Sequence, residues 1–168
     1  LGLQPKSAAR WVNEELEDWA RLAVEGHQQA RRPWVDYHEH ARDPLARLVG
    51  ALPHEVVAMN SLTVNLHLMM ASFYRPSGDR TRIVIEDSAF PSDSYAVESQ
   101  AIHHGLAPGE TVVRLRPRPG EDNLRTEDVL DLLEREGRHV ALLLLGGVNY
   151  LTGQLMDMPA ITKAGRAA

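Results

Sequence analysis

The residues best suited to chemistry lie in the stretch from Met59 to Leu68, which reads Met-Asn-Ser-Leu-Thr-Val-Asn-Leu-His-Leu. Ser61 and Thr63 stand where a short apolar run gives way to apolar residues at helical spacing, so we expect them at the start of a helix. The first N–H groups of a helix have no partners inside it, and the helix dipole makes that end positive. Such a turn can bind a phosphate or another anion, but most hydroxyl residues at helix starts only cap the helix. Taken by itself, the stretch leaves both interpretations open.

Other reactive constellations are weak. The sequence has eight histidines, including the pair His38 and His40 and the adjacent His103 and His104. Neither pair has a third ligand at a usual spacing, so we expect no metal site. The sequence contains no Gly-x-Ser-x-Gly elbow and no P-loop, which argues against a serine hydrolase and against a nucleoside triphosphatase.

The composition sets further bounds. The chain has 168 residues, of which 43% are hydrophobic and 24% charged, as in ordinary globular proteins. A formal net charge of −5 argues against nucleic-acid partners. The absence of cysteine excludes disulfides, thiolate nucleophiles and cysteine-based zinc sites. No apolar run approaches the ~20 residues that span a bilayer, and the first residues do not read as a signal peptide, so we expect no membrane partner and a soluble, cytoplasmic protein.

Strand and helix patterns alternate along most of the chain. A long amphipathic helix is expected over residues 5–25, with its apolar face on Val12, Leu16 and Trp19 and its end at Gly26. A short helix over 45–52 follows Pro44. Strands are then expected over 55–59, 82–86, 111–115 and 140–145, with helices over 62–74, 92–104, 127–136 and from about 159.

This order predicts an α/β fold, a three-layer α-β-α arrangement with a mostly parallel sheet. The continuously apolar strand over 140–145 is expected to be covered on both faces. Ligands of such sheets bind beyond the carboxyl ends of the strands, so the candidate loops are 60–63, 86–93, 116–125 and 146–153. The chain begins without an initiator Met and stops inside the last predicted helix, from which we expect a fragment of a longer protein.

Four stretches, in this order and spacing, resemble the kynureninases, which are pyridoxal-phosphate (PLP) enzymes of the aspartate-aminotransferase fold type (fold type I). They are residues 1–6, 59–68, 89–93 and 147–154, and the closing segment 159–165 also fits. The resemblance covers essentially the whole chain. It implies an N-terminal helical segment over 1–50 and a partial PLP-binding large domain over 51–168, incomplete at its C-terminal end.

The resemblance also implies roles for individual residues. Leu62 and Thr63 would hold the PLP phosphate at the helix start. Phe90 and Pro91 belong to the segment that lines the cofactor ring, with Phe90 stacked on the pyridine face. Ser92 and Asp93 would add polar contacts around the ring, although the segment without the resemblance is an ordinary helix entry.

Two further positions follow from the resemblance. His27 would lie against the aromatic part of the substrate, whereas the plain alternative is a solvent-exposed loop histidine. Gly146 occupies a position where the family often has a hydroxyl residue that touches the cofactor. Because Gly has no side chain to offer, a water or a backbone N–H would have to substitute, and we rank this position below the others.

The implied reaction is hydrolysis of L-kynurenine, 3-hydroxy-L-kynurenine or both to the corresponding anthranilate and L-alanine, a step of tryptophan catabolism and NAD biosynthesis. It needs a lysine that holds PLP as a Schiff base. The only lysines are Lys6 and Lys163, and neither matches the family's lysine, which lies later in the chain. No catalytic residue is therefore assigned, and we expect the chain alone to be inactive.

The resemblance implies a homodimer in the complete enzyme, with kynurenine as the small-molecule partner. Two alternatives stay open. One is a non-catalytic α/β scaffold that binds a partner, and the other is a different PLP enzyme related to cysteine desulfurases or aminotransferases. The Leu-Thr-Val-Asn-Leu-His sequence at the phosphate turn argues against the second alternative.

Overall fold

A computed structural model describes residues 2–168. The chain divides into two compact units, one running up to Asn60 and one comprising Ser61–Ala168. The predicted division into domains after residue 50 concerns the longer enzyme and stays a prediction. None of the helices in residues 2–168 is long and apolar enough to cross a membrane.

The amino-terminal unit is helical. Its elements are α1 (Ala8–Leu22), a 3-10 turn (Ala23–Glu25), α2 (Gly26–Gln29), α3 (Glu39–Val49) and a second 3-10 turn (Pro53–Glu55). The predicted end of the first helix at Gly26 is wrong. The α-helix ends earlier, at Leu22, because the next residue, Ala23, has a φ of +46°. The predicted helix over 45–52 in fact starts at Glu39, with Pro44 inside it. It ends at Gly50, whose positive φ suits the residue that closes a helix.

The predicted strand over 55–59 is wrong. After the 3-10 turn the backbone stays irregular up to Asn60. A short apolar run becomes a strand only where a neighbouring strand accepts its backbone hydrogen bonds. Within the described part of the chain, no strand pairs with this segment.

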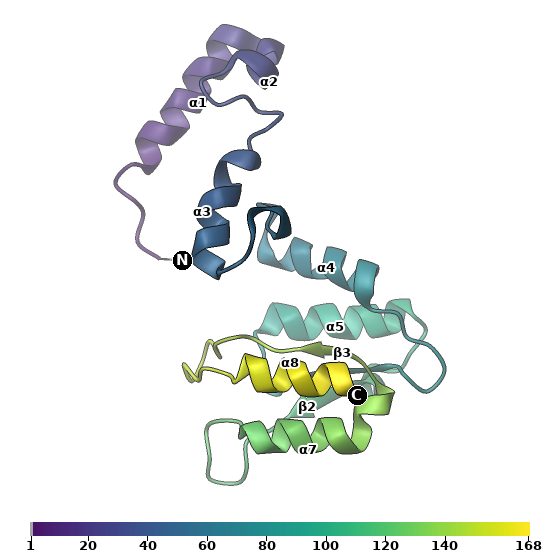
Figure 1. The fold of residues 1–168 in the computed structure, drawn as a ribbon. Coiled ribbons are helices and arrows are strands. Elements are labelled where there is room, and N and C mark those ends of the chain that lie inside the picture. Colours follow the sequence, from purple (N-terminus) through teal and green to yellow (C-terminus); the bar gives the residue numbers. More distant parts are fainter. Residues whose placement is uncertain (1) are drawn as a thin grey trace. The chain divides into compact units, whose positions relative to one another are not determined.

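The carboxyl-terminal unit contains a three-stranded, all-parallel sheet in the order β2-β1-β3. The strands are β1 (Arg82–Glu86), β2 (Val112–Leu115) and β3 (Val140–Leu144). The helices are α4 (Leu62–Phe73), α5 (Pro91–His103), the short α6 (Pro108–Thr111), α7 (Thr126–Glu136) and α8 (Met158–Ala167), drawn in Figure 1. The predicted α/β class with helix layers on a parallel sheet is confirmed.

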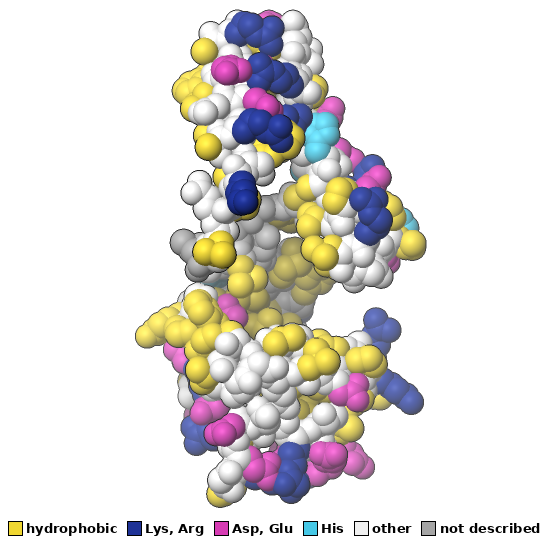
Figure 2. Space-filling model, turned by 90° about the vertical axis from the view of Figure 1, so that its left-hand side faces the viewer, with side chains coloured by type: hydrophobic (Ala, Val, Ile, Leu, Met, Phe, Trp, Pro, Cys, Tyr) yellow, Lys and Arg dark blue, Asp and Glu magenta, His cyan; other side chains and the backbone are white. Residues whose placement is uncertain are grey.

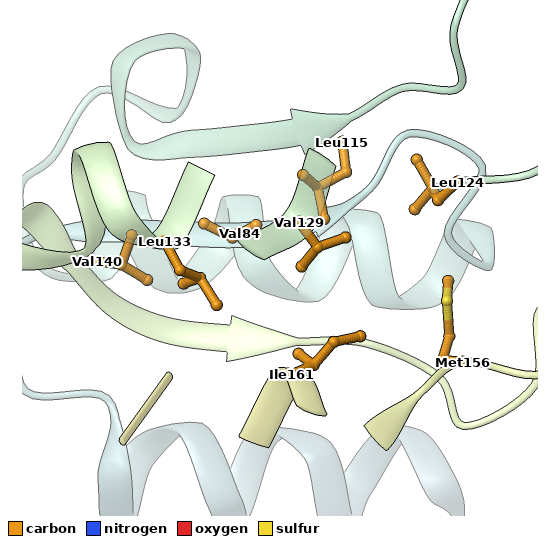
Figure 3. Close-up of a cluster of buried hydrophobic side chains, with 8 residues drawn as sticks. All are labelled: Val84, Leu115, Leu124, Val129, Leu133, Val140, Met156 and Ile161. Atoms are coloured by element: carbon orange, nitrogen blue, oxygen red, sulfur yellow. The ribbon is translucent and has the colours of Figure 1, made fainter. Parts of the chain in front are cut away.

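The central strand β1 separates two hydrophobic clusters. Ile83 and Ile85 pack on one face, where the cluster also contains Met70 and Tyr74 from the α4 end and Val97 from α5. Alternate residues of a strand point to opposite faces, so Val84 packs on the other face. Figure 3 shows this second cluster, which α7 and α8 complete: Val84, Leu115, Leu124, Val129, Leu133, Val140, Met156 and Ile161.

The third strand contributes to both clusters, as its apolar sequence predicts, but it is not fully buried. Leu143 packs on the α7 and α8 side, whereas Leu142 and Leu144 pack on the α4 and α5 side. Residues 141–144 nevertheless stay half-buried. β3 pairs with β1 only, and within residues 2–168 no strand lies along its other edge.

The expected apolar face of α1 is exposed. Val12, Leu16 and Trp19 keep 58%, 51% and 64% of their surface accessible. The one buried residue of α1 is Asp18, which accepts a hydrogen bond of 2.8 Å from the Arg31 backbone N–H and one of 3.1 Å from Arg21. The Arg31 N–H lowers the pKa of Asp18 because it stabilises the ionised carboxylate. Figure 2 shows hydrophobic side chains at the surface of the molecule.

The loop after α2 is held against α1. Trp34 donates its indole N–H to Glu15 over 3.0 Å. A Cβ at Gly26 would overlap the indole ring of Trp34. Gly26 is therefore needed for a close approach between α2 and the indole.

We predict that Asp18→Asn destabilises the amino-terminal unit. All three tryptophans lie in this unit, at positions 11, 19 and 34, so tryptophan fluorescence during urea unfolding reports on it alone. The pKa of Asp18 is lower in the folded state, so its contribution is present above the unfolded value of about 3.9 and is lost as the pH falls through the lowered pKa. Asp18→Asn should remove this pH dependence, and the exposed Asp36→Asn should retain it. An unchanged pH profile in Asp18→Asn would contradict the prediction.

We predict that Gly26→Ala destabilises the same unit by about 1–3 kcal/mol, because the added methyl group must displace the Trp34 ring. Fluorescence-detected urea unfolding measures the effect. Gly2→Ala serves as the control, since a Cβ there meets nothing within 4 Å. Equal stability of the two variants would show that the indole moves aside without cost.

Candidate functional site

The carboxyl ends of the three parallel strands define one edge of the sheet. β1 ends at Glu86, β2 at Leu115 and β3 at Leu144, and the loops that follow them leave from the same side. Three of the four expected loops, 86–93, 116–125 and 146–153, therefore start at this edge. The fourth, 60–63, leads into α4 from irregular backbone instead of from a strand.

The start of α4 carries Leu62 and Thr63. Ser61 is the N-cap residue, with φ −78° and ψ 163°, yet within residues 2–168 its side chain makes no capping hydrogen bond. Leu62 is 71% exposed and Thr63 is also exposed. The first N–H groups of this 12-residue helix thus lack the side-chain cap that the plain interpretation requires. Among the described residues, Ser7 at the start of α1 also makes no capping hydrogen bond, so the anion site at α4 stays a prediction.

Phe90, Pro91, Ser92 and Asp93 form the start of α5. Phe90 is the N-cap and Pro91 the first helical residue, a position where Pro loses no hydrogen bond. Ser92 Oγ donates to Asp93 Oδ1 over 3.3 Å, and the Asp93 backbone N–H donates to Phe90 O over 2.9 Å. The Asp93 carboxylate thus lies in the first turn, where the helix dipole favours negative charge.

The starts of α4 and α5 belong to one layer. The two helices pack together through the cluster that contains Met70, Tyr74, Ala96 and Val97. Figure 1 shows them running in the same direction, so their amino-terminal ends lie on the same side of the unit. The predicted phosphate turn and the predicted ring-stacking segment therefore lie on the side of the unit where the strands end.

Phe90 meets the segment that follows β3. Its ring centroid lies 5.1 Å from that of Tyr150, with the planes at 77°, an edge-to-face pair. Phe90 is 49% exposed and Tyr150 57% exposed, so both rings retain free surface. Tyr150 sits on a hairpin in which Val148 and Leu155 pair as an antiparallel bridge.

Gly146 opens the same segment. A Cβ there would lie 3.1 Å from the Val148 carbonyl oxygen and 3.8 Å from Glu86 Oε2. A side chain at this position would therefore point past the end of β1, toward a carboxylate. The 3.1 Å approach is tighter than an ordinary van der Waals contact, so a side chain here would crowd the Val148 carbonyl.

The sequence predictions missed Glu86 and Asn149. Glu86 is only 6% exposed and Asn149 5% exposed, and Asn149 Nδ2 donates to Glu86 Oε1 over 3.2 Å. A charged residue directly after Ile83-Val84-Ile85 was the available signal, because a carboxylate that ends a buried strand needs a donor. The identity of that donor was not readable locally, since it lies 63 residues away.

His27 lies in the amino-terminal unit, on α2, and the structure describes its surroundings there. Its ring packs edge-to-face against Trp34, with centroids 5.4 Å apart. The ring is otherwise exposed. Its expected role beside a substrate stays a prediction.

The two lysines lie in different units. Lys6 precedes α1 in the amino-terminal unit, and Lys163 lies exposed on α8, which packs on the opposite face of the sheet through Ile161. Lys163 lines a shallow groove with Leu130 and Glu134 of α7. In residues 2–168, no three His, Asp or Glu side chains gather in the way that metal ligands do.

Comparisons with known proteins point in one direction. No family model matches the chain. A kynureninase of Salinispora tropica is 70% identical over 168 residues, which is all of this chain and 39% of that protein. A kynureninase of Myxococcus xanthus is 61% identical over 167 residues, and human kynureninase is 47% identical over 167 residues, 36% of its length. Since identity at this level runs along the whole chain, we conclude that the chain belongs to the kynureninase family and spans about 39% of the length of the curated relatives it matches.

Proposed function

We propose that this chain forms the phosphate-binding and ring-stacking part of a PLP-dependent kynureninase. The complete enzyme would hydrolyse the Cβ–Cγ bond of L-kynurenine, 3-hydroxy-L-kynurenine or both, releasing the anthranilate and L-alanine. The observation that carries the proposal is the 70% identity to a kynureninase along the full chain. A cytoplasmic homodimer remains part of the same proposal.

The residues present fit PLP. The uncapped start of α4 offers backbone N–H groups and the Thr63 hydroxyl to a phosphate. Phe90 offers a half-exposed aromatic face to a planar ring. Asp93 adds a carboxylate in the first turn of α5. Phosphate and ring contacts of this kind bind and orient a cofactor without any covalent bond to the chain.

When bound, PLP supplies an electron sink that stabilises negative charge at the substrate Cα. The part played by this chain is to hold and orient. Leu62 and Thr63 would hold the phosphate end, and Phe90 would stack on the ring. His27 would contact the aromatic group of the substrate, and Ser92 and Asp93 would complete the polar surroundings of the ring.

The chain lacks a residue for the covalent step. Lys6 and Lys163 are its only lysines; Lys6 belongs to the amino-terminal unit, and Lys163 lies on α8, which packs on the face of the sheet opposite α5. The proton transfers at the substrate must therefore use residues of the longer enzyme. This division predicts cofactor binding without turnover.

We predict that the 168-residue chain binds PLP weakly and does not hydrolyse L-kynurenine. Inorganic phosphate should compete with PLP for the site. Thr63→Ala should weaken PLP binding by at least about tenfold, because a hydrogen bond to a charged phosphate contributes about 1.5–3 kcal/mol. Fluorescence titration measures the binding, and anthranilate fluorescence measures turnover. Thr162→Ala, an exposed change on α8, is the matched control. Turnover by the isolated chain would overturn the division of roles described above.

We also predict that the chain is functional inside a complete kynureninase. In a chimera, residues 1–168 replace the matching stretch of the Salinispora tropica enzyme. We expect the chimera to release anthranilate from L-kynurenine, and Thr63→Ala in the chimera to raise the PLP concentration needed for half-maximal activity. A folded chimera that binds PLP but does not hydrolyse kynurenine would favour a non-catalytic scaffold.

A further inference from the structure

A buried amide joins two segments at the carboxyl end of β1. Asn149 Nδ2 donates to Glu86 Oε1 over 3.2 Å and to Ser88 Oγ over 3.1 Å. Asn149 Oδ1 accepts from the backbone N–H groups of Leu151 and Thr152, each over 2.9 Å. An asparagine amide has two donor hydrogens and two acceptor lone pairs, so all four are used.

The full use of this amide makes the position specific. Aspartate has the same shape as asparagine but donates nothing when ionised. At position 149 it would place a second carboxylate beside the buried Glu86, where like charges repel strongly. Alanine would leave the buried Glu86 carboxylate without this donor.

The same residue organises the hairpin that carries Tyr150. The Asn149 backbone N–H donates a hydrogen bond to Gln154 O over 2.9 Å, and the Gly153 N–H donates one to Asn149 O over 3.0 Å. Gly153 has a φ of +73°, which a side chain would strain. The hairpin is therefore closed on itself and anchored to β1 at one residue.

Both partners of the aromatic pair depend on this anchor. Tyr150 directly follows Asn149, and Phe90 lies two residues after Ser88, which Asn149 also contacts. The two rings meet edge-to-face at 5.1 Å. A hydrogen-bonded amide thus connects the hairpin under Tyr150 with the segment that leads to Phe90.

We propose that Asn149 is a positioning residue for the cofactor ring. By fastening the hairpin to Glu86 and Ser88, it holds Tyr150 against Phe90, and this contact sets the angle at which Phe90 presents its face. The inference rests on the proposed function, because it gives Phe90 a ring to stack on. According to this inference, Asn149 and Tyr150 affect the binding of the cofactor ring and not the binding of its phosphate.

The test compares two probes, PLP and inorganic phosphate, on the 168-residue chain and its variants. Asn149→Asp should weaken PLP binding about tenfold and change phosphate binding by less than about twofold, since the α4 turn is untouched. Tyr150→Ala should reproduce the effect, and Tyr150→Phe should keep normal binding because it retains the ring. Leu155→Ala, an exposed change in the same hairpin, is the control. Fluorescence titration follows PLP, and phosphorus NMR follows phosphate.

The outcomes separate the inference from the proposed function. Suppose that the unmodified chain binds PLP in competition with phosphate, and that Asn149→Asp and Tyr150→Ala bind PLP normally. This result would overturn the inference and leave the proposed function standing. Equal weakening of both probes in Tyr150→Ala would also overturn it, because that result indicates a general loss of structure. Absence of PLP binding by the unmodified chain would count against the proposed function and against the inference with it. If Asn149→Asp fails to fold by circular dichroism, the two Tyr150 variants decide the question.

Discussion

The parallel pairing of β1 with both of its neighbours is the constraint on which the carboxyl-terminal unit depends. Ile83, Val84 and Ile85 have no exposed surface, and they supply both hydrophobic clusters. Their alternation assigns α4 and α5 to one face and α7 and α8 to the other. Because the neighbouring strands are parallel to β1, the carboxyl ends of all three strands lie at one edge of the sheet. The candidate site exists because Phe90, Gly146 and Asn149 follow those ends.

Much of this unit was predictable because its signals are local. The apolar strands, the helical spacing over α4 and α7, and the proline at the start of α5 each act within a few residues. The errors arose where long-range contacts decide the structure. The segment 55–59 has the composition of a strand, but no strand of the described residues 2–168 pairs with it. The buried face of α1 carries Asp18, whose backbone donor is 13 residues away. Pro44 indicates a helix start in the sequence, whereas the helix begins at Glu39 and contains Pro44.

The site was predictable to a different degree. Ser61 and Thr63 could be placed at a helix start from spacing alone. Within residues 2–168 the Ser61 side chain makes no capping hydrogen bond, and the anion site at this turn stays a prediction. The roles of Phe90 and Asp93 at the cofactor were predicted only from the family resemblance, since the residues alone indicate an ordinary helix start. The Glu86 and Asn149 contact joins positions 63 residues apart, so no local pattern announces it. The spacing of residues in the sequence thus predicts one part of the candidate site, and the other part depends on contacts that form only in the folded chain.

Pro91 has a consequence for the energetics of any planar ligand that stacks on Phe90. The pyrrolidine ring of a proline disfavours helical backbone angles for the residue before it, and Phe90 has φ −54° and ψ 136°. The backbone that carries the aromatic ring is therefore restricted before a ligand arrives. Ordering a flexible loop on binding lowers affinity through lost conformational entropy, and a preorganised backbone avoids much of that loss. Pro91 can thus strengthen binding without touching the ligand, by reducing the number of conformations that the free protein has to give up.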